Sequence, residues 1–302
     1  MRIVVALGGN ALLERGERPD SDVQEHNVAV AVAALAPLAA EHELIVTHGN
    51  GPQVGVLALE SANDPMLSHP YPLDSLGAET QGLIGYWLVQ HLQHELPDRL
   101  VAAVITQTVV DPADPAFERP TKFVGPVYAE HELRPIADRR GWAIAPDGDR
   151  WRRVVASPTP LRVVEAPVVE LLLDAGTIVV CVGGGGIPVV DRPGRGLVGV
   201  EAVIDKDLSS ALLAEQLGAD ALVVLTDVAG IYRGFGTPSA ELIRSATPAE
   251  LRAIDFPAGS MGPKVDALCR FVERTGGVAV VGALADAAVL LSGERGTLVS
   301  AP

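Results

Sequence analysis

The sequence has few aromatic residues and very few cysteines. Aromatic residues make up only 4% of its 302 positions, so a core must be built mainly from Val, Leu, Ile and Ala. The two cysteines, Cys181 and Cys269, stand in apolar surroundings, and no CxxC motif or Cys/His cluster accompanies them. This pattern argues against a disulfide framework and against a zinc site, and we expect no resident metal site in the chain.

Basic residues are also scarce. The 23 Lys and Arg face 38 Asp and Glu, which gives a formal net charge of -15. A nucleic-acid or anionic-membrane surface needs a basic footprint, so we expect neither partner. No run of about 18 apolar residues marks a membrane span. The first nine residues are typical of a short strand and not of a signal peptide, and we expect a cytoplasmic protein.

What the sequence does contain is a series of short apolar runs that alternate with amphipathic stretches. Continuous apolar runs are typical of strands buried on both faces in a parallel sheet. Strands are predicted over residues 3–7, 44–47, 101–108, 177–182, 221–226 and 278–281, and helices over 23–41, 75–96 and 265–273. The alternation predicts an α/β protein with a mainly parallel open sheet and helices on both faces.

The segment from about residue 111 to 160 has a different character. It is rich in Pro, Asp and Arg and has no long period, and its apolar pieces at 142–145 and 151–156 are typical of small strands. We interpret it as an inserted lobe or lid. A long disordered loop is the alternative, and such loops are uncommon inside compact domains.

Three predicted strands lead directly into glycine-rich loops: Gly8-Gly9, Gly49-Asn50-Gly51 and Gly183–Gly186. In an open parallel sheet the ligand lies beyond the carboxyl ends of the strands, so all three loops fall on the ligand edge. Glycine lets backbone N–H groups approach an anion, and helix N-termini favour negative charge. Each loop alone could be a structural turn, but together they indicate phosphoryl chemistry.

Two common nucleotide motifs are missing. The chain has no GxxxxGK[ST] sequence, which excludes a P-loop kinase. The Gly183–Gly186 run lacks the helix pattern that follows a dinucleotide fingerprint, because Pro188 and Pro193 interrupt it. A dinucleotide-dependent oxidoreductase is therefore disfavoured.

Lysines at helix starts supply candidate cations. Asp205, Lys206 and Asp207 open an amphipathic helix, where the simplest alternative is a helix cap followed by a solvated lysine. Lys264 follows Gly259-Ser-Met-Gly-Pro, which we interpret as a fixed loop that aims it inward, and Lys122 in the inserted lobe is a third candidate. The stretch from Thr226 to Tyr232 follows a strand and suits the rim of a nucleotide site, although an ordinary turn would look the same.

These segments together resemble the carbamate kinases of the amino-acid kinase superfamily. Most amino-acid kinases carry a lysine just ahead of the first Gly-Gly, a place held here by Ala6, and Lys206 is present instead, as in carbamate kinases. The matching motifs run in the family's order: Ala6-Leu-Gly-Gly-Asn-Ala-Leu12, Thr47-His-Gly-Asn-Gly-Pro-Gln-Val-Gly55, Thr80-Gln-Gly-Leu-Ile-Gly-Tyr86, Pro120-Thr-Lys-Phe-Val-Gly-Pro126, Arg152-Arg-Val-Val-Ala-Ser-Pro158, Gly183-Gly-Gly-Gly-Ile-Pro-Val-Val190, Gly199-Val-Glu-Ala-Val-Ile-Asp-Lys-Asp207 and Gly259-Ser-Met-Gly-Pro-Lys264.

The resemblance implies a three-layer αβα sandwich with a small protruding subdomain inserted at about 111–160. It implies an acceptor-binding part over 1–205 and a nucleotide-binding part over 206–302. The implied activity is reversible, Mg²⁺-dependent phosphoryl transfer between ATP and carbamate, giving carbamoyl phosphate and ADP. It also implies a homodimer, and use of the reverse reaction for ATP formation in arginine and carbamoyl phosphate catabolism.

The resemblance also implies roles for residues. Lys206 and Lys264 would neutralise the transferred phosphoryl group, Asp207 would orient them, and Lys122 would reach the acceptor carboxylate. Substrate contacts would come from Gly8, Gly9, Asn10, Gly49, Asn50, Gly51, Gly184 and Gly185. Nucleotide contacts would come from Thr226, Asp227, Val228, Tyr232, Met261, Gly262 and Lys264. The departures from the family pattern, Arg119 and Phe123, concern packing of the lid.

Two alternatives stay open at this point. A related kinase could phosphorylate another small carboxylate or a phosphonate, and the pocket around Asn10, Asn50 and Lys122 would decide this. A nucleotide-binding regulator could share the scaffold without catalysis, since a fold does not fix a function. Retention of all the candidate lysines argues against a regulator.

Overall fold

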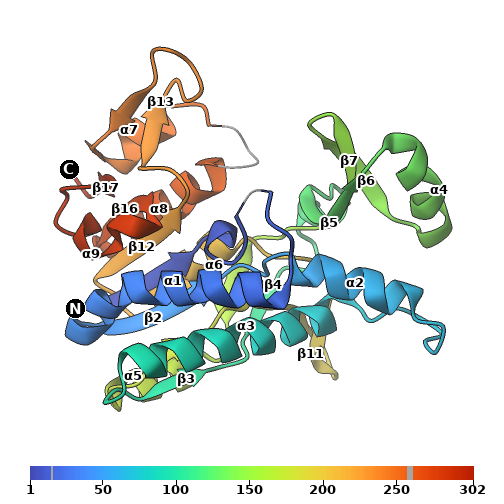
Figure 1. Cartoon of the computed structure of the whole chain (residues 1–302), viewed down its shortest axis with the longest axis horizontal. Helices are drawn as coiled ribbons and strands as arrows, with labels where there is room; N and C mark the ends of the chain where they lie inside the picture. The colour runs from blue at the N-terminus through green and yellow to red at the C-terminus, as the bar shows by residue number, and fades with distance from the viewer. Residues whose placement is uncertain (15, 257–260) are drawn as a thin grey trace.

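The computed structural model describes residues 1–14, 16–256 and 261–302, with Asn10 described by its backbone alone. A twisted eight-stranded sheet forms its centre (Figure 1). From one edge to the other the strands are β15 (Ser245–Ala246), β17 (Thr297–Val299), β16 (Val278–Ala283), β12 (Ala221–Thr226), β1 (Arg2–Leu7), β2 (Glu43–His48), β9 (Ile178–Val180) and β3 (Val101–Ala103). Neighbours from β16 to β3 pair in parallel, and β17 runs antiparallel to β16. The predicted mainly parallel open sheet is confirmed.

Helices cover both faces of this sheet, which explains the continuous apolar runs. Val4 and Ala6 of β1 pack toward α5 (Ala166–Asp174), α6 (Lys206–Gln216) and α8 (Met261–Thr275). Ile3, Val5 and Leu7 pack toward α1 (Ser21–Glu41), α3 (Leu73–Glu95) and α9 (Ala287–Leu290). Every residue from Ile3 to Leu7 is fully buried, because each side chain on either face meets a helix. The three-layer αβα sandwich is therefore confirmed.

Helix α1 is long and apolar enough to cross a membrane when judged by length and hydropathy alone. Its Val28, Val32 and Leu35 are fully buried in the core cluster that β1 and β2 share. The helix therefore acts as a core helix in this structure, and its apolar face is used for packing.

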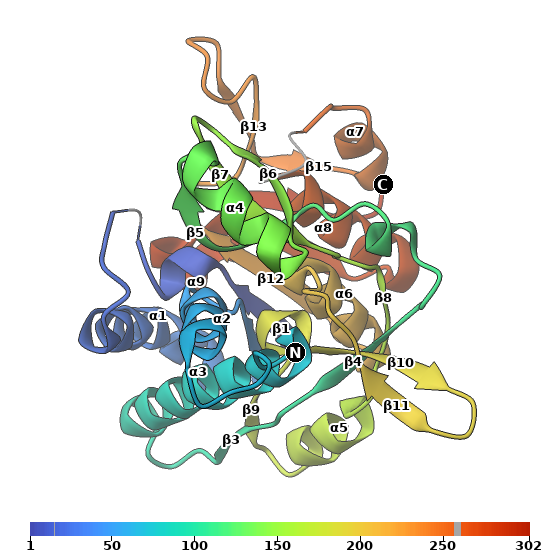
Figure 2. The same cartoon turned by 90° about the vertical axis from the view of Figure 1, so that its right-hand side faces the viewer.

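Two smaller sheets flank the central one. The first contains β11 (Gly196–Gly199), β10 (Ile187–Arg192), β4 (Gln107–Val110) and β8 (Pro160–Val163), and its β10–β11 hairpin projects from the body (Figure 2). The second contains β5 (Lys122–Tyr128), β7 (Arg150–Val155) and β6 (Ala143–Asp147), and α4 (Glu130–Arg140) packs on it. We call residues 122–155 the inserted subdomain. It protrudes from the main body (Figure 1).

Stacked arginines and tryptophans hold the inserted subdomain together. The guanidinium groups of Arg140 and Arg153 lie 5.0 and 4.6 Å from the ring centroid of Trp142. Arg134 lies 5.1 Å from the ring centroid of Trp151. Such cation–π contacts add stabilisation to the burial of aliphatic side chains such as Leu133 and Val155.

The remaining elements connect these layers. They are α2 (Gln53–Asn63), the hairpin β13 (Ile231–Arg233) and β14 (Glu241–Ile243), α7 (Pro248–Arg252), and the 3-10 helices η1 (Gly9–Ala11), η2 (Pro115–Phe117), η3 (Gly183–Gly185) and η4 (Leu284–Asp286). The hairpin β13–β14 and the inserted subdomain project from the same side of the body (Figure 1).

Two sequence predictions about local structure were wrong. The strand expected over 101–108 is two strands, because β3 pairs with β9 in the central sheet whereas β4 leaves it to pair with β10. The loop expected before Lys264 is partly helical, since Gly262 and Pro263 lie in the first turn of α8, where proline is tolerated. Gly259 and Ser260 of the same motif lie outside the described residues.

Candidate active site

The three glycine loops meet at one edge of the central sheet. Strands β1, β2 and β9 are adjacent and parallel, so their carboxyl ends point the same way. Gly8 packs closely on the neighbouring strand, because a Cβ there would stand 2.8 Å from the carbonyl oxygen of Leu225. The sheet topology thus creates the shared edge that the sequence predicted.

The third loop has an unusual backbone. Val182 adopts a left-handed conformation with φ 52° and ψ 35°, and Gly184 follows with φ 63° and ψ 13°. A β-branched residue at positive φ is strained and is held there by its surroundings. The Val182 N–H donates to Thr106 Oγ1 at 2.8 Å, and Thr106 is itself bound to the side-chain oxygen of Gln81. Gly185 and Gly186 also have positive φ, and successive backbone N–H groups in tight turns of this kind can form anion-binding nests.

Hydroxyl groups fix the other end of this loop. Ser209 Oγ and Thr108 Oγ1 both donate to the Gly185 carbonyl oxygen, at 2.8 and 3.0 Å. The loop therefore cannot turn this carbonyl toward an incoming anion. Electrostatic repulsion between a carbonyl oxygen and a phosphate is avoided by this arrangement.

The second loop contacts the third. Asn50 Oδ1 accepts a hydrogen bond from Thr80 Oγ1 at 3.0 Å, and the Asn50 side chain fills the space that a Cβ on Gly184 would need. Gly49 lies against the aliphatic stem of Lys206, because a Cβ added to Gly49 would stand 3.7 Å from Lys206 Cδ. The two loops and Lys206 therefore form one continuous surface.

A buried carboxylate between two lysines faces these loops. Asp207 Oδ2 accepts a hydrogen bond from Lys264 Nζ at 2.8 Å, and Asp207 Oδ1 accepts one from Lys206 Nζ. The side chain of Asp207 is 4% exposed, and those of Lys206 and Lys264 are 11% and 18% exposed. Helix α6 supplies two members of this cluster and the first turn of α8 supplies the third.

The three charges shift one another's pKa values. Burial acts to raise the pKa of Asp207, but the two ammonium groups outweigh it and hold this pKa well below its usual range. Burial lowers the pKa of Lys206, which Asp207 opposes and Lys264 reinforces. Burial acts in the same direction on Lys264, yet the charge and hydrogen bond of Asp207 outweigh it and its pKa is raised. Lys206 is thus the member that loses its proton more readily.

His48 at the end of β2 is fully buried and serves the loop. Burial lowers its pKa to about 4, and the Lys206 charge acts in the same direction. A neutral imidazole can donate from Nδ1 to the Gly49 carbonyl oxygen, 2.8 Å away. The ring also lies where a Cβ on Gly183 would stand. We interpret His48 as a packing and orienting residue of the loops.

The third candidate cation approaches from the inserted subdomain. Lys122, the first residue of β5, places its Nζ 2.8 Å from Asp205 Oδ2. Asp205 directly precedes Lys206 in the chain. The sequence contains only three lysines, Lys122, Lys206 and Lys264, so every lysine of this acidic chain lies at this site.

A cavity of about 460 Å³ adjoins the first glycine loop, and a volume on the order of 300–1,000 Å³ is typical of ligand pockets. Gly8, Thr226 and Asp227 line it, together with Ala11, Glu14, Leu225, Ala283 and Leu284. Of the other predicted nucleotide contacts, Val228, Tyr232, Met261 and Gly262 do not line this cavity. The side chain of Asn10 lies outside the described residues, while its backbone belongs to η1.

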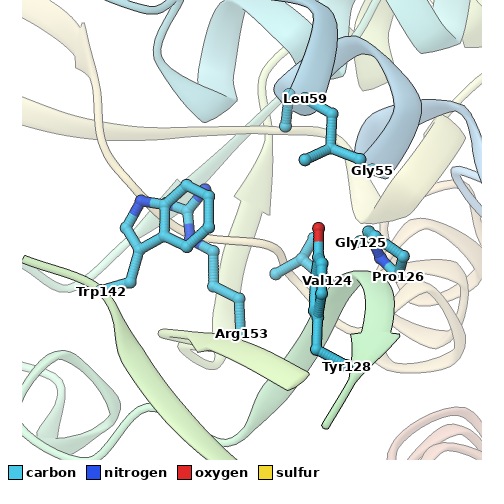
Figure 3. A pocket seen from close by; sticks show the side chains of 9 residues that line it. Gly55, Leu59, Val124, Gly125, Pro126, Tyr128, Trp142 and Arg153 are labelled. Atoms are coloured by element: carbon cyan, nitrogen blue, oxygen red, sulfur yellow. The ribbon is translucent and has the colours of Figure 1, made fainter. Parts of the chain in front are cut away.

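A smaller pocket separates the inserted subdomain from α2 (Figure 3). Gly55 and Leu59 of α2 form one wall, and Tyr128, Trp142 and Arg153 lie across from them. Beside it the two backbones almost touch, because a Cβ on Gly55 would stand 2.5 Å from the Cα of Gly125. The inserted subdomain thus rests on α2 at a contact that only glycine permits.

Comparison with known proteins identifies this arrangement. A model of the amino acid kinase family matches residues 1–282. The chain belongs to this family, and within it to the carbamate kinases. It is 53% identical over 304 residues to a carbamate kinase of Rhizobium meliloti, covering 99% of the chain and 93% of the relative. It is 49% identical over 298 residues to one of Escherichia coli K12, covering 99% of each.

A solved carbamate kinase has the same fold. The enzyme of Giardia lamblia bound to AMP-PNP superimposes with a TM-score of 0.91 at 37% identity, covering 100% of the chain and 98% of that structure. The family resemblance that the sequence motifs suggested is therefore confirmed over nearly the full length.

The charged groups at this site are suited to binding an anionic substrate, as expected for a member of this kinase family. Two ammonium groups share one carboxylate, so the cluster keeps a net positive charge beside the glycine loops. Phosphoryl transfer depends chiefly on positioning and charge neutralisation, which this geometry supplies. Among the described residues, no group of three or more His, Cys, Asp or Glu could hold a metal ion. Mg²⁺ commonly binds through substrate phosphates, with few protein ligands, which suits such a site.

Sequence reasoning assigned no role to several residues that build this site. Gln81, Thr106, Thr108 and Ser209 support the third loop, and Asp205 binds Lys122. Gln81 stands in a motif that matches the family, so the sequence indicated that this position matters. It did not indicate that Gln81 bonds to Thr106. The partners lie 24 or more residues apart along the chain, and only the fold joins them.

Proposed function

We propose that the chain is a carbamate kinase that catalyses reversible phosphoryl transfer between ATP and carbamate. The observation that carries this proposal is the Lys206–Asp207–Lys264 cluster beside the glycine loops, in a chain that matches carbamate kinases from end to end. Carbamate is already an anion, so its oxygen can attack the γ-phosphorus without a general base. Magnesium enters with the nucleotide as part of the substrate.

In this mechanism the residues have separate tasks. Lys206 and Lys264 neutralise charge on the transferred phosphoryl group, and Asp207 keeps both ammonium groups in place. Backbone N–H groups of the loop at Gly184 and Gly185 bind phosphoryl or acceptor oxygens. Preorganised donors of this kind are worth roughly 10²–10³ in turnover when one is removed. Lys122 binds the acceptor carboxylate from the side of the inserted subdomain.

The nucleotide occupies the C-terminal part in this proposal. The cavity lined by Gly8, Thr226 and Asp227 would take part of it, next to the first glycine loop. Val228, Tyr232, Met261 and Gly262 would contact the rest, outside this cavity. Citrate and AMP-PNP bind the Giardia lamblia enzyme, and we infer that an ATP-type nucleotide binds here.

The test is formation of ATP from ADP and carbamoyl phosphate with Mg²⁺, measured through a coupled assay. Turnover in the wild type, and loss of at least two orders of magnitude in Lys264→Met, is expected. Arg295→Gln, a charge change outside the site, serves as the control. Absence of wild-type turnover, with turnover on another small carboxylate or a phosphonate, would move the assignment to a different acceptor.

We further propose a cytoplasmic homodimer that forms ATP during arginine and carbamoyl phosphate catabolism. Strand β3 stands at one end of the central sheet, and apolar side chains are exposed around it: Leu100 is 65% and Ile105 45% exposed. Tyr86 on α3, which packs on β3, is 57% exposed. Pairing of two such edges would cover these residues. Light scattering of the wild type and of Ile105→Glu would test this, with a dimer expected only for the former.

A further inference from the structure

The segment from Glu201 to Asp205 lies between the inserted subdomain and the helix that carries Lys206. Arg153 Nη2 of β7 is 3.6 Å from Glu201 Oε2. The strand continues into Ala156, which forms a parallel bridge with Ala202 and accepts a hydrogen bond from Val203 N–H at 2.9 Å. The inserted subdomain is therefore joined to this segment by main chain as well as by side chains.

Asp205 ends the segment and makes two kinds of contact with one carboxylate. Its Oδ1 accepts hydrogen bonds from the N–H groups of Asp207 and Leu208, at 2.9 and 3.3 Å, and so caps α6. Its Oδ2 accepts one from Lys122 Nζ at 2.8 Å. The side chain of Asp205 is 15% exposed and that of Lys122 is 36% exposed. One carboxylate thus connects the inserted subdomain to the first turn of the catalytic helix.

This connection restrains a side chain that would otherwise be mobile. A lysine has a flexible four-carbon stem and three donors on Nζ. With one donor bound to Asp205, the other two remain for a substrate oxygen. Restraining the stem before substrate arrives reduces the entropy lost on binding, which is the general advantage of preorganisation.

We propose that Asp205 is a positioning residue that couples Lys122 of the inserted subdomain to the α6 end bearing Lys206 and Asp207. The inference rests on the proposed function, because it assigns Lys122 to the acceptor. Asp205 touches no reacting atom. It acts by holding Lys122 over the site and by fixing the turn from which Lys206 extends.

Asp205→Asn separates the two contacts. Asparagine caps a helix about as well as aspartate, so α6 and the melting temperature should be preserved. The charge that holds Lys122 is lost. We expect kcat/KM for carbamoyl phosphate to fall about tenfold, which corresponds to the loss of one oriented ion pair, while KM for ADP stays within twofold. Glu201→Gln, in the same segment, is the matched control: its ion pair with Arg153 is long and its carboxylate is 55% exposed, so the loss contributes little and both substrates should stay within twofold.

A double-mutant cycle shows whether Asp205 acts through Lys122. In a Lys122→Met background, Asp205→Asn should change kcat/KM by less than twofold. An undiminished tenfold effect in that background would overturn the proposal, because Asp205 would then act without Lys122. Wild-type kinetics in Asp205→Asn alone would overturn it as well.

Hydrogen exchange of the ligand-free protein gives a readout that does not depend on turnover. Asp205→Asn and Lys122→Met should each speed amide exchange in β5, whereas Glu201→Gln should leave β5 as in the wild type. If the wild type fails to use carbamoyl phosphate but β5 exchange rises in both variants, the proposed function fails and the coupling stands. If turnover is present while Asp205→Asn changes neither exchange nor kcat/KM, the coupling fails and the function stands.

Discussion

Replacement of Asp207 by asparagine should remove the anion that two buried ammonium groups share. Asparagine keeps the size of the side chain, but its amide nitrogen faces one lysine as a second donor. The carboxylate is 4% exposed, so water cannot take over its role. Removal of one partner from a buried ion pair costs about 3–5 kcal/mol. At a few degrees per kcal/mol for a chain of this size, the melting temperature should drop by roughly 10 °C.

The same helix provides a control. Glu215 of α6 forms an ion pair with Arg274 at 2.9 Å, but the two side chains are 35% and 56% exposed. An exposed pair contributes about 0–1 kcal/mol, so Glu215→Gln should lower the melting temperature by no more than about 3 °C. Calorimetry of the two variants thus compares ion pairs of similar length and different burial.

The stability of the Asp207→Asn variant should depend on pH because of the pKa of Lys206. Without the carboxylate, the pKa of Lys206 falls further below its unfolded value. Between the folded and unfolded pKa values the unfolded chain binds more protons, so the stability of the variant should rise with pH. In the wild type the low pKa of Asp207 makes stability rise with pH as well, but in the acidic range, since its contribution is present above the unfolded pKa and is lost as pH falls through the folded one.

Turnover of Asp207→Asn should fall by about 10²–10³, since both lysines lose their orientation. This account of the cluster would be refuted if the melting temperature of Asp207→Asn matched that of Glu215→Gln and did not change between pH 7 and pH 10. Normal turnover in the variant would show that the two lysines need no shared anion.

Three further predictions concern the surrounding structure. Thr106→Val should lower turnover about tenfold, because the buried Val182 N–H loses its acceptor, and an unpaired buried donor costs about 1–3 kcal/mol. Thr106→Ser keeps the hydroxyl and should retain wild-type turnover. Equal kinetics in the two variants would contradict the role of the hydroxyl. Gly55→Ala should displace the inserted subdomain and raise KM for carbamoyl phosphate, and an unchanged KM would show that the contact can yield. Burial raises the pKa of Cys181 and raises that of Cys269 to about 11, so a thiol reagent at pH 7 should label neither until the protein is denatured.

Strand positions could be predicted from the sequence because their cause is local. Residues 3–7, 221–226 and 278–281 are continuous apolar runs, and the structure places strands there. Helix α4 was not predicted, because Pro135 and many charges conceal its pattern, and the packing of Leu133 and Ala137 decides it. The break between β3 and β4 was missed because only three residues separate the two strands and pairing with different sheets, not the local sequence, divides them.

Part of the candidate site was accessible from the sequence in the same way. Glycines at strand ends and lysines at helix starts can be read from the residues, and motif order identified the family. The functional roles of Lys122, Lys206, Asp207 and Lys264 stay predictions. The residues alone do not show which groups pair: Asp207 as partner of Lys264, 57 residues away, was implied only by the family resemblance, and Asp205 as partner of Lys122, 83 residues away, was not predicted.

The sequence by itself determined the α/β class, the mainly parallel sheet with glycine loops after its strands, and the family. These depend on local apolar runs and on motifs. Tertiary structure alone decided that Lys264 joins Lys206 at Asp207, that Val182 takes a strained conformation, and that the carboxylate capping α6 also holds Lys122. The physical reason is that burial and long-range hydrogen bonds set the charge and position of these groups. Contacts along the chain, such as Lys206 with Asp207, supply only part of this, and Lys264 and Lys122 join from 57 and 83 residues away.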